Sequence, residues 1–175
     1  WEVRKGTDDL VRAFCEEFRA DEPVELMLHC SNPWIPRFDL EANIRRAAHG
    51  SHAPILASQP VAGDAIVDVY RDADAFVLPT RAEGWGLPII EAMACGLPVI
   101  VTNYSAPAEY VNDAIGYPIR VEAMIDVDDR WFFPEGRAAG QWAQPDAAHL
   151  RAVMRHVFEH PDEASEKGRR AREEV

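Results

Sequence analysis

Apolar residues along this chain follow two patterns that alternate. Short continuous runs, which are typical of strands buried on both faces, lie at residues 24–30, 54–57, 75–78, 99–102 and 116–121. Stretches with apolar residues at helical spacing lie among these runs, and each follows a residue that favours a helix start: Thr7, Asp39, Asp64, Pro88 and Asp146. Strands that alternate with helices predict an α/β fold built on a doubly wound, Rossmann-like parallel sheet.

Two stretches depart from this alternation. Between residues 122 and 144 the periodicity is lost, and aromatic residues stand among aspartates and glycines. We expect an irregular insertion whose aromatic side chains pack over the sheet edge, with a lid that contacts a ligand as the alternative. Residues 146–175 predict C-terminal helices. Their last part, from Pro161, is so charged that we expect either a marginal helix or one that docks against another domain.

Composition narrows the classes of protein that fit. The 175 residues suit one domain, and 30 acidic against 18 basic residues give a net charge of −12, which disfavours binding to nucleic acid or to an anionic membrane. No apolar run reaches the roughly 18 residues that a membrane span requires, so we expect no transmembrane segment and take the cytoplasm as the default location. The odd number of cysteines predicts free thiols at Cys15, Cys30 and Cys95.

The segment from Glu83 to Glu91 carries the candidate chemistry. Gly84 and Gly86 allow a ligand to approach the backbone, and the helix predicted after Gly86 would leave the N–H groups of Gly86 and Leu87 facing outward. Such a helix start holds a phosphate through oriented donors and the helix dipole. The flanking carboxylates can accept hydrogen bonds from sugar hydroxyls. The combination predicts a site for a nucleotide-sugar.

The two glutamates with seven residues between them, followed by the stretch 92–100, resemble the signature of retaining GT-B glycosyltransferases, in particular glycosyltransferase family 4. The stretch 70–80 is similar to the family's helix end, buried strand and turn, Lys5-Gly6 to its Lys-Gly loop, and 102–110 to its return toward the donor. The resemblance implies that residues 1–175 are a single donor-binding domain, the C-terminal half of a GT-B glycosyltransferase. The first strand and an N-terminal acceptor-binding domain would lie upstream.

The resemblance also implies roles for individual residues. Glu91 would hold the ribose hydroxyls, and Glu83 would contact the transferred sugar and stabilise positive charge at its anomeric carbon. Lys5, with the amides of Gly86 and Leu87, would bind the diphosphate of a nucleoside-diphosphate sugar. Transfer would proceed with retention of configuration and without a metal or other cofactor. The family often supplies a second cation upstream of the segment that begins here.

Some expectations rest on weaker signals. Trp85 is either a core residue or part of the sugar pocket, and the loop at residues 58–63 is expected to recognise the base, largely through its backbone. Asp-x-Asp pairs, which hold the metal in transferases of another fold, occur at 72–74 and 126–128, but the first precedes its strand and the second lies in the irregular segment. His29 is expected to be a core or pocket-edge residue rather than a catalyst.

Other interpretations of the motif remain open. Without the resemblance, Glu83 and Glu91 would be solvated residues around a helix start, and Lys5 a surface lysine. A GT-B phosphorylase or a nucleotide-sugar epimerase would share the fold and the phosphate site. A non-catalytic module that binds a nucleotide-sugar would keep the sheet without transferring the sugar.

Overall fold

The computed structural model describes residues 1–58, 61, 63–129, 132–133 and 140–175. Its strands form two parallel sheets and one antiparallel hairpin. In the first sheet β1 (Leu26–Leu28) pairs with β2 (Ile55–Ala57), and in the second the order is β3 (Phe76–Leu78), β4 (Val99–Thr102), β5 (Tyr117–Ile119). Each of these strands lies within an apolar run that predicted one. The α/β fold with parallel sheets is therefore confirmed.

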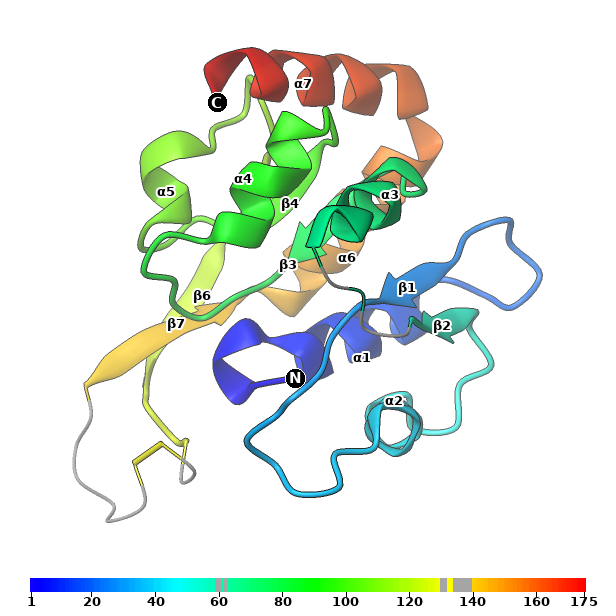
Figure 1. Ribbon diagram of the computed structural model, residues 1–175, viewed down its shortest axis with the longest axis vertical. Helices are drawn as coiled ribbons and strands as arrows, with labels where there is room; N and C mark the ends of the chain where they lie inside the picture. The colour runs from blue at the N-terminus through cyan, green and yellow to red at the C-terminus, as the bar shows by residue number, and fades with distance from the viewer. Residues whose placement is uncertain (59–60, 62, 130–131, 134–139) are drawn as a thin grey trace.

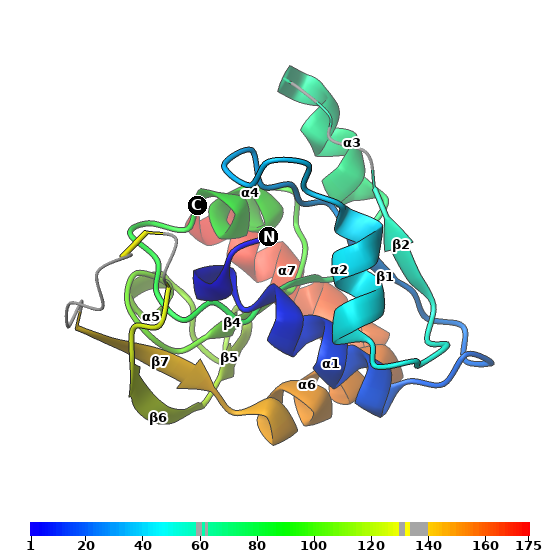
Figure 2. The ribbon, with the colours of Figure 1, turned by 90° about the horizontal axis from the view of Figure 1, so that it is seen from below.

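Helices cover both faces of the second sheet (Figures 1 and 2). The helices are α1 (Thr7–Glu17), α2 (Leu40–Ala47), α3 (Ile66–Arg71), α4 (Leu87–Ala94), α5 (Pro107–Tyr110), α6 (Ala147–Glu159) and α7 (Pro161–Glu174), with short 3₁₀ turns η1 (Val3–Lys5) and η2 (Gly63–Ala65). Helices α1 and α6 pack together on one face, whereas α4 lies on the other face with α7 behind it. Among the described residues, no helix is both long and apolar enough to cross a membrane.

Strand β4 shows why these runs are continuously apolar. Its side chains point alternately to the two faces of the sheet, so Ile100 packs with the residues of α1 and α6, while Val99 and Val101 pack with those of α4. All three are at most 1% exposed. A strand that is buried on both faces has no position at which a polar side chain would reach water, which accounts for the absence of alternation in its sequence.

Three of the five predicted helix starts are matched, by the caps Asp39 and Asp146 and by Pro88 in the first turn of α4. The start predicted at Asp64 differs, because this residue lies within η2 and α3 begins at Ile66 without a side-chain cap, and so does the one at Thr7. The carboxylates of Asp39 and Asp146 accept hydrogen bonds from the amides of Ala42 and His149, each at 2.9 Å, as expected of N-caps. Thr7 was expected to cap α1, but it is the first helical residue and Gly6 takes the cap position. Gly6 has a φ of 68°, and a Cβ there would lie 2.1 Å from the carbonyl oxygen of Pro79.

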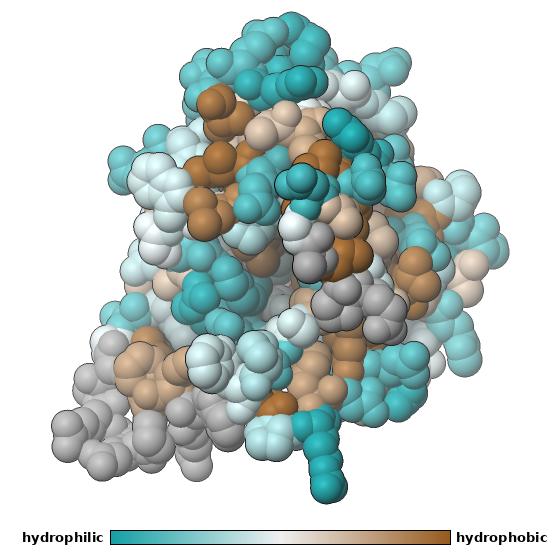
Figure 3. Space-filling model, viewed as in Figure 1, coloured by the Kyte–Doolittle hydropathy of each residue, from teal (hydrophilic) through white to brown (hydrophobic). Residues whose placement is uncertain are grey.

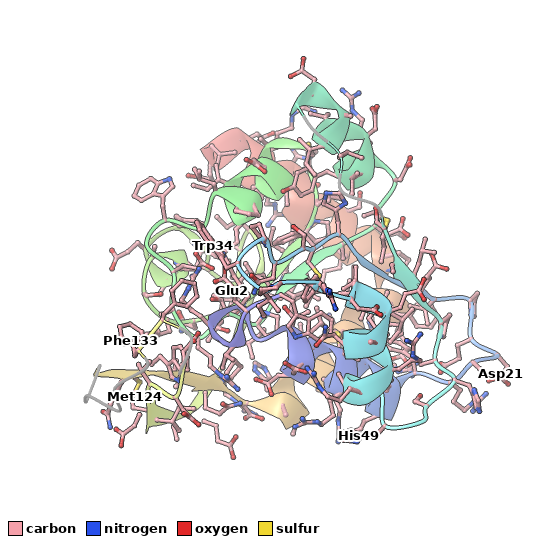
Figure 4. The ribbon with its side chains drawn as sticks, turned by 60° about the horizontal axis from the view of Figure 1, so that its bottom comes forward. Glu2, Asp21, Trp34, His49, Met124 and Phe133 are labelled. Carbon is pink, nitrogen blue, oxygen red and sulfur yellow. The ribbon has the colours of Figure 1, made fainter. Side chains whose placement is uncertain are left out.

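The predicted irregular insertion at 122–144 is wrong at both of its ends. Strands β6 (Val121–Asp126) and β7 (Gln141–Pro145) pair as an antiparallel hairpin that extends away from the helices (Figure 1). In Figure 4, Met124 and Phe133 mark this side of the molecule, opposite Asp21. Strand β6 is mostly exposed, so it has no buried run that could have revealed it.

The aromatic residues of this segment do not share one environment. Trp142 is 4% exposed and packs against the body of the domain, as expected, whereas Phe132 and Phe133 are 50% and 46% exposed. Trp131, which was also expected to pack over the sheet edge, lies outside the described residues. The expected burial is therefore confirmed for Trp142, whose ring lies under the Arg81 guanidinium, and is wrong for the two phenylalanines.

The charged segment after Pro161 folds onto this chain itself. It forms α7, whose small residues Gly168 and Ala171 face α4 and the turn after it, and Ala171 is fully buried. A Cβ at Gly168 would lie 2.1 Å from the carbonyl oxygen of Gly96. Because α7 packs closely on α4 of the same chain, the expectation that it needs another domain to dock against is wrong.

Candidate functional site

The candidate site lies where β3 and β4 end, beside η1. The chain leaves β3 through Pro79 and Thr80, and the amide of Arg81 donates to the carbonyl oxygen of Arg4 at 2.7 Å. This bond ties the loop that carries Glu83 to the loop that carries Lys5, although 78 residues separate these two side chains. Loops at the carboxyl ends of parallel strands commonly bind ligands in this fold class.

The carboxylate of Glu83 is nearly enclosed by donors. Its side chain is 6% exposed, and its Oε1 lies 2.6 Å from Lys5 Nζ and 3.2 Å from Arg4 Nη1. The hydroxyl of Thr80 lies 3.2 Å from the same oxygen. The structure therefore brings together two residues that the motif predicted, Lys5 and Glu83. Hydrogen bonds between ionised partners are short and strong, so this cluster orients the carboxylate.

Arg4 is a site residue that the sequence prediction missed. Its guanidinium forms an ion pair with Glu83, and it donates to the carbonyl oxygen of Ala82 at 2.8 Å and to the carboxylate of Glu2 at 3.2 Å. A planar group with several donors can hold a loop carbonyl and a carboxylate at once. The signal in the sequence was the adjacency of two cations, Arg4 and Lys5, in a strongly acidic chain.

Glu91 lies one turn into α4 and is exposed to solvent. The hydroxyl of Tyr70 donates to its Oε2 at 2.8 Å. Burial of Tyr70 and its bond to the carboxylate raise the pKa of the phenol, so it remains a donor at every physiological pH. Its bond to Glu91 leaves the other carboxylate oxygen available to a ligand.

The start of α4 presents backbone donors beside these carboxylates. Gly86 is buried, has a φ of 79° and occupies the N-cap position. Within the described part of the chain, the amides of Gly86 and Leu87 donate to no other residue. The left-handed φ of Gly86 would strain any other residue, and a Cβ there would lie 2.7 Å from the hydroxyl of Tyr110, so this position favours glycine. Gly84, in contrast, has open space around it and is not required sterically.

Trp85 is not a core residue. Its side chain is 62% exposed, and its ring centroid lies 6.3 Å from that of Tyr110. In Figure 3 the apolar atoms of the face drawn there form separate groups with hydrophilic atoms between them. Trp85 therefore stands as an exposed aromatic surface next to the helix start.

Residues 1–130 match the family model of "Glycosyl transferases group 1". The chain belongs to the group 1 glycosyl transferases. A D-inositol 3-phosphate glycosyltransferase of Segniliparus rotundus is 31% identical over 160 residues, which are 89% of this chain and 33% of that protein. The lipopolysaccharide core biosynthesis mannosyltransferase LpsB of Rhizobium meliloti is 52% identical over 76 residues, which are 37% of this chain and 22% of that protein.

An O-antigen chain mannosyltransferase B of Escherichia coli is 50% identical over 58 residues, 32% of this chain and 15% of that protein. The group 1 glycosyl transferase chain described here thus spans a third or less of the length of these curated relatives.

Solved structures agree on the fold. Sucrose-phosphate synthase from Thermosynechococcus elongatus superposes with a TM-score of 0.68 at 22% identity, covering 99% of this chain and 38% of that one. The C-terminal domain of a group 1 glycosyl transferase, LpcC from Francisella tularensis, gives 0.68 at 19% identity, covering the whole of this chain and 80% of that one. The expected fold, the C-terminal half of a GT-B glycosyltransferase, is confirmed.

Other expected residues have plain structural surroundings. Nδ1 of His29 lies 3.1 Å from the hydroxyl of Ser58. Among the described residues, no group of three or more His, Cys, Asp or Glu side chains could hold a metal ion.

Cys15, Cys30 and Cys95 are free thiols, as predicted. The expected base-recognition loop, 58–63, falls partly outside the described residues, which omit 59–60 and 62.

Proposed function

We propose that this chain binds the donor in a glycosyltransferase that moves a sugar from a nucleoside diphosphate to an acceptor with retention of configuration. One observation carries the proposal: two cations pair with a buried carboxylate that stands three residues before the N-cap of α4, where the amides of Gly86 and Leu87 donate to no other described residue. The cations and the amides suit the diphosphate of a nucleotide-sugar, and the carboxylate suits its sugar. Membership of the group 1 glycosyl transferases supports the same function.

The diphosphate would lie between the cations and the start of α4. The amides of Gly86 and Leu87 supply oriented donors, and the helix dipole favours negative charge there by about 0.3–2 kcal/mol. Lys5 and Arg4 supply the positive charge. Because negative charge on the diphosphate grows as the sugar leaves, these groups would stabilise the transition state more than the bound donor.

Glu83 would face the transferred sugar. Positive charge develops at the anomeric carbon as its bond to the phosphate lengthens, and a carboxylate held in place beside it stabilises that charge without reorganising. Lys5, Arg4 and Thr80 all lie against Oε1, so the other oxygen, Oε2, would accept a hydrogen bond from a sugar hydroxyl. No step needs a metal in this scheme.

Glu91 would accept hydrogen bonds from the two ribose hydroxyls. The bond from Tyr70 fixes one carboxylate oxygen, so the carboxylate is oriented before the donor arrives. A hydrogen bond to a charged acceptor contributes about 1.5–3 kcal/mol. The base would be read by the backbone near residues 58–63.

Acceptor binding and completion of the reaction are assigned to an N-terminal domain of a longer chain. The described site holds the donor side only. Retention follows if the acceptor attacks from the face that the phosphate leaves, with the leaving phosphate taking the acceptor's proton. Two relatives that are at least 50% identical over part of this chain are named mannosyltransferases, so mannose conjugates come first among candidate donors.

The test begins with calorimetry of this chain against UDP, GDP, ADP and their common sugar conjugates. Binding of one nucleotide should be weakened in Glu91→Gln and unchanged in Glu41→Gln, an exposed glutamate on α2. In the full-length enzyme, Glu83→Gln should retain nucleotide binding but lose transfer. Wild-type activity that survives both Glu83→Gln and Glu91→Gln would refute the proposal, and tight binding without any transfer would instead favour a non-catalytic module.

A further inference from the structure

Ser105 has a backbone conformation that L-residues rarely adopt. Its φ is 54°, and within the described ranges the other non-glycine residues with positive φ are Arg37 and His49. Those two are exposed and lie in turns, whereas Ser105 is half-buried between β4 and α5. Strained backbone that is held in place by its surroundings often marks a functional position.

The side chain of Ser105 contacts the proposed catalytic loop. Its hydroxyl oxygen accepts a hydrogen bond from the backbone amide of Glu83 at 2.9 Å. A second bond follows from the same segment, because the hydroxyl of Tyr110 donates to the carbonyl oxygen of Trp85 at 2.7 Å. Residues 105–110 therefore hold the loop 83–86 at both of its ends.

The turn that places this hydroxyl is itself fixed by backbone bonds. The amide of Tyr104 donates to the carbonyl oxygen of Thr102 at 2.8 Å, and the amide of Ala108 donates to that of Ser105 at 3.1 Å. Thr102 is the last residue of β4 and is fully buried. These bonds thus anchor the turn that carries the Ser105 hydroxyl to the buried end of β4.

The geometry assigns Ser105 as a positioning residue for Glu83, an inference that rests on the proposed function. Lys5 and Arg4 hold the end of the Glu83 side chain, but they would also contact the diphosphate, so their hold changes when the donor binds. The bond from the Glu83 amide to Ser105 needs no ligand and fixes the root of the side chain. Because small displacements of a catalytic group reduce rate strongly, this bond sets the approach of the carboxylate to the anomeric carbon.

Two substitutions separate this role from a structural one. Ser105→Gly removes the hydroxyl and relieves the left-handed strain, whereas Ser105→Thr keeps a hydroxyl but places a β-branched residue in a conformation that it tolerates poorly. His49→Gly is the matched control, because it relieves the same kind of strain at an exposed turn away from the site. The variants are made in the full-length enzyme.

We expect Ser105→Gly to reduce kcat more than stability, and Ser105→Thr to reduce stability more than kcat. Ser105→Gly should shift the unfolding midpoint by less than about 4 °C, because strain relief and the freer unfolded chain oppose each other. Its kcat should fall roughly 10²-fold with little change in KM. Ser105→Thr should lower the unfolding midpoint while keeping more of the kcat, and His49→Gly should leave kcat unchanged.

The measurement is kcat and KM for the sugar conjugate of whichever nucleotide binds, beside thermal unfolding of each variant. The assignment of Ser105 is overturned if kcat follows the unfolding midpoint across the series, or if Ser105→Gly keeps the wild-type kcat. In either case, sugar transfer by the wild-type enzyme leaves the proposed function intact. A wild-type enzyme that transfers no sugar refutes the proposed function, and the assignment of Ser105 with it.

Discussion

Replacing Gly168 with alanine sets two effects of opposite sign against each other. Gly168 lies inside α7, where alanine would favour the helix by about 1 kcal/mol. Its Cβ, however, would lie 2.1 Å from the carbonyl oxygen of Gly96, 2.7 Å from the amide nitrogen of Pro98 and 2.8 Å from the carbonyl carbon of Leu97. All three are backbone atoms, which cannot rotate away as the end of a side chain can.

The magnitude follows from the distance. Ordinary van der Waals contact begins near 3.4 Å, so α7 must move by about 1.3 Å. That movement loosens the fit of the buried Ala171 and of the α4 residues beneath it. Overpacking of a well-packed core costs about 1–3 kcal/mol. The new Cβ would meet backbone atoms, which cannot move aside, so we expect a cost near the upper end of this range. We therefore expect a net loss of about 2 kcal/mol after subtracting the helix propensity.

The assay is thermal or urea unfolding of this chain, with Ser165→Ala as the matched control. Ser165 lies on the exposed face of the same helix, so its replacement changes propensity without a clash. Gly168→Ala should lower the unfolding midpoint by roughly 4–8 °C, whereas Ser165→Ala should leave it unchanged or raise it slightly. If Gly168→Ala stabilises the chain as Ser165→Ala does, the close packing of α7 on α4 is refuted.

Two further predictions concern single hydrogen bonds. Tyr70→Phe removes the donor to Glu91 and should weaken nucleotide binding by roughly 5- to 15-fold in calorimetry, with kcat nearly unchanged; equal affinity would exclude a role in orienting the carboxylate. At the start of α6, Nδ1 of His149 accepts from the amide of Arg120 at 3.0 Å, and burial lowers the pKa of His149. The unfolded chain then binds more protons, so stability should fall as the pH drops below about 6.5. His149→Asn keeps an acceptor that does not titrate and should flatten this part of the pH profile, whereas His52→Asn, in an exposed loop, should leave it unchanged.

The parallel strands and the central motif could be predicted because their signals are local. A run such as residues 99–102 is apolar since both of its faces are buried, and the spacing of Glu83 and Glu91 reflects one loop and one helical turn. The hairpin β6–β7 gave no such signal. Strand β6 is exposed, so its sequence contains neither a buried run nor a clean alternation.

The supporting residues of the site could not be predicted, because their roles depend on contacts between distant segments. Tyr70 and Glu91 are 21 residues apart, and Ser105 and Glu83 are 22 apart. Nothing in the local pattern distinguishes these two hydroxyls from others in the chain. Only the folded sheet, which brings the ends of β3 and β4 together, shows which hydroxyl meets which partner.

The charges of the site explain how so acidic a chain could hold a diphosphate. The whole sequence carries a formal charge of −12, which repels an anion at long range. At physiological salt, however, such repulsion between exposed charges is largely screened beyond about 8 Å. Arg4 and Lys5 both lie in contact with Glu83, and Arg4 also pairs with Glu2, so two cations offset two carboxylates and the site itself carries no excess negative charge. The acidic surface then opposes binding only weakly, whereas the two cations act at contact distance, and Glu83 keeps them in place until the phosphates arrive.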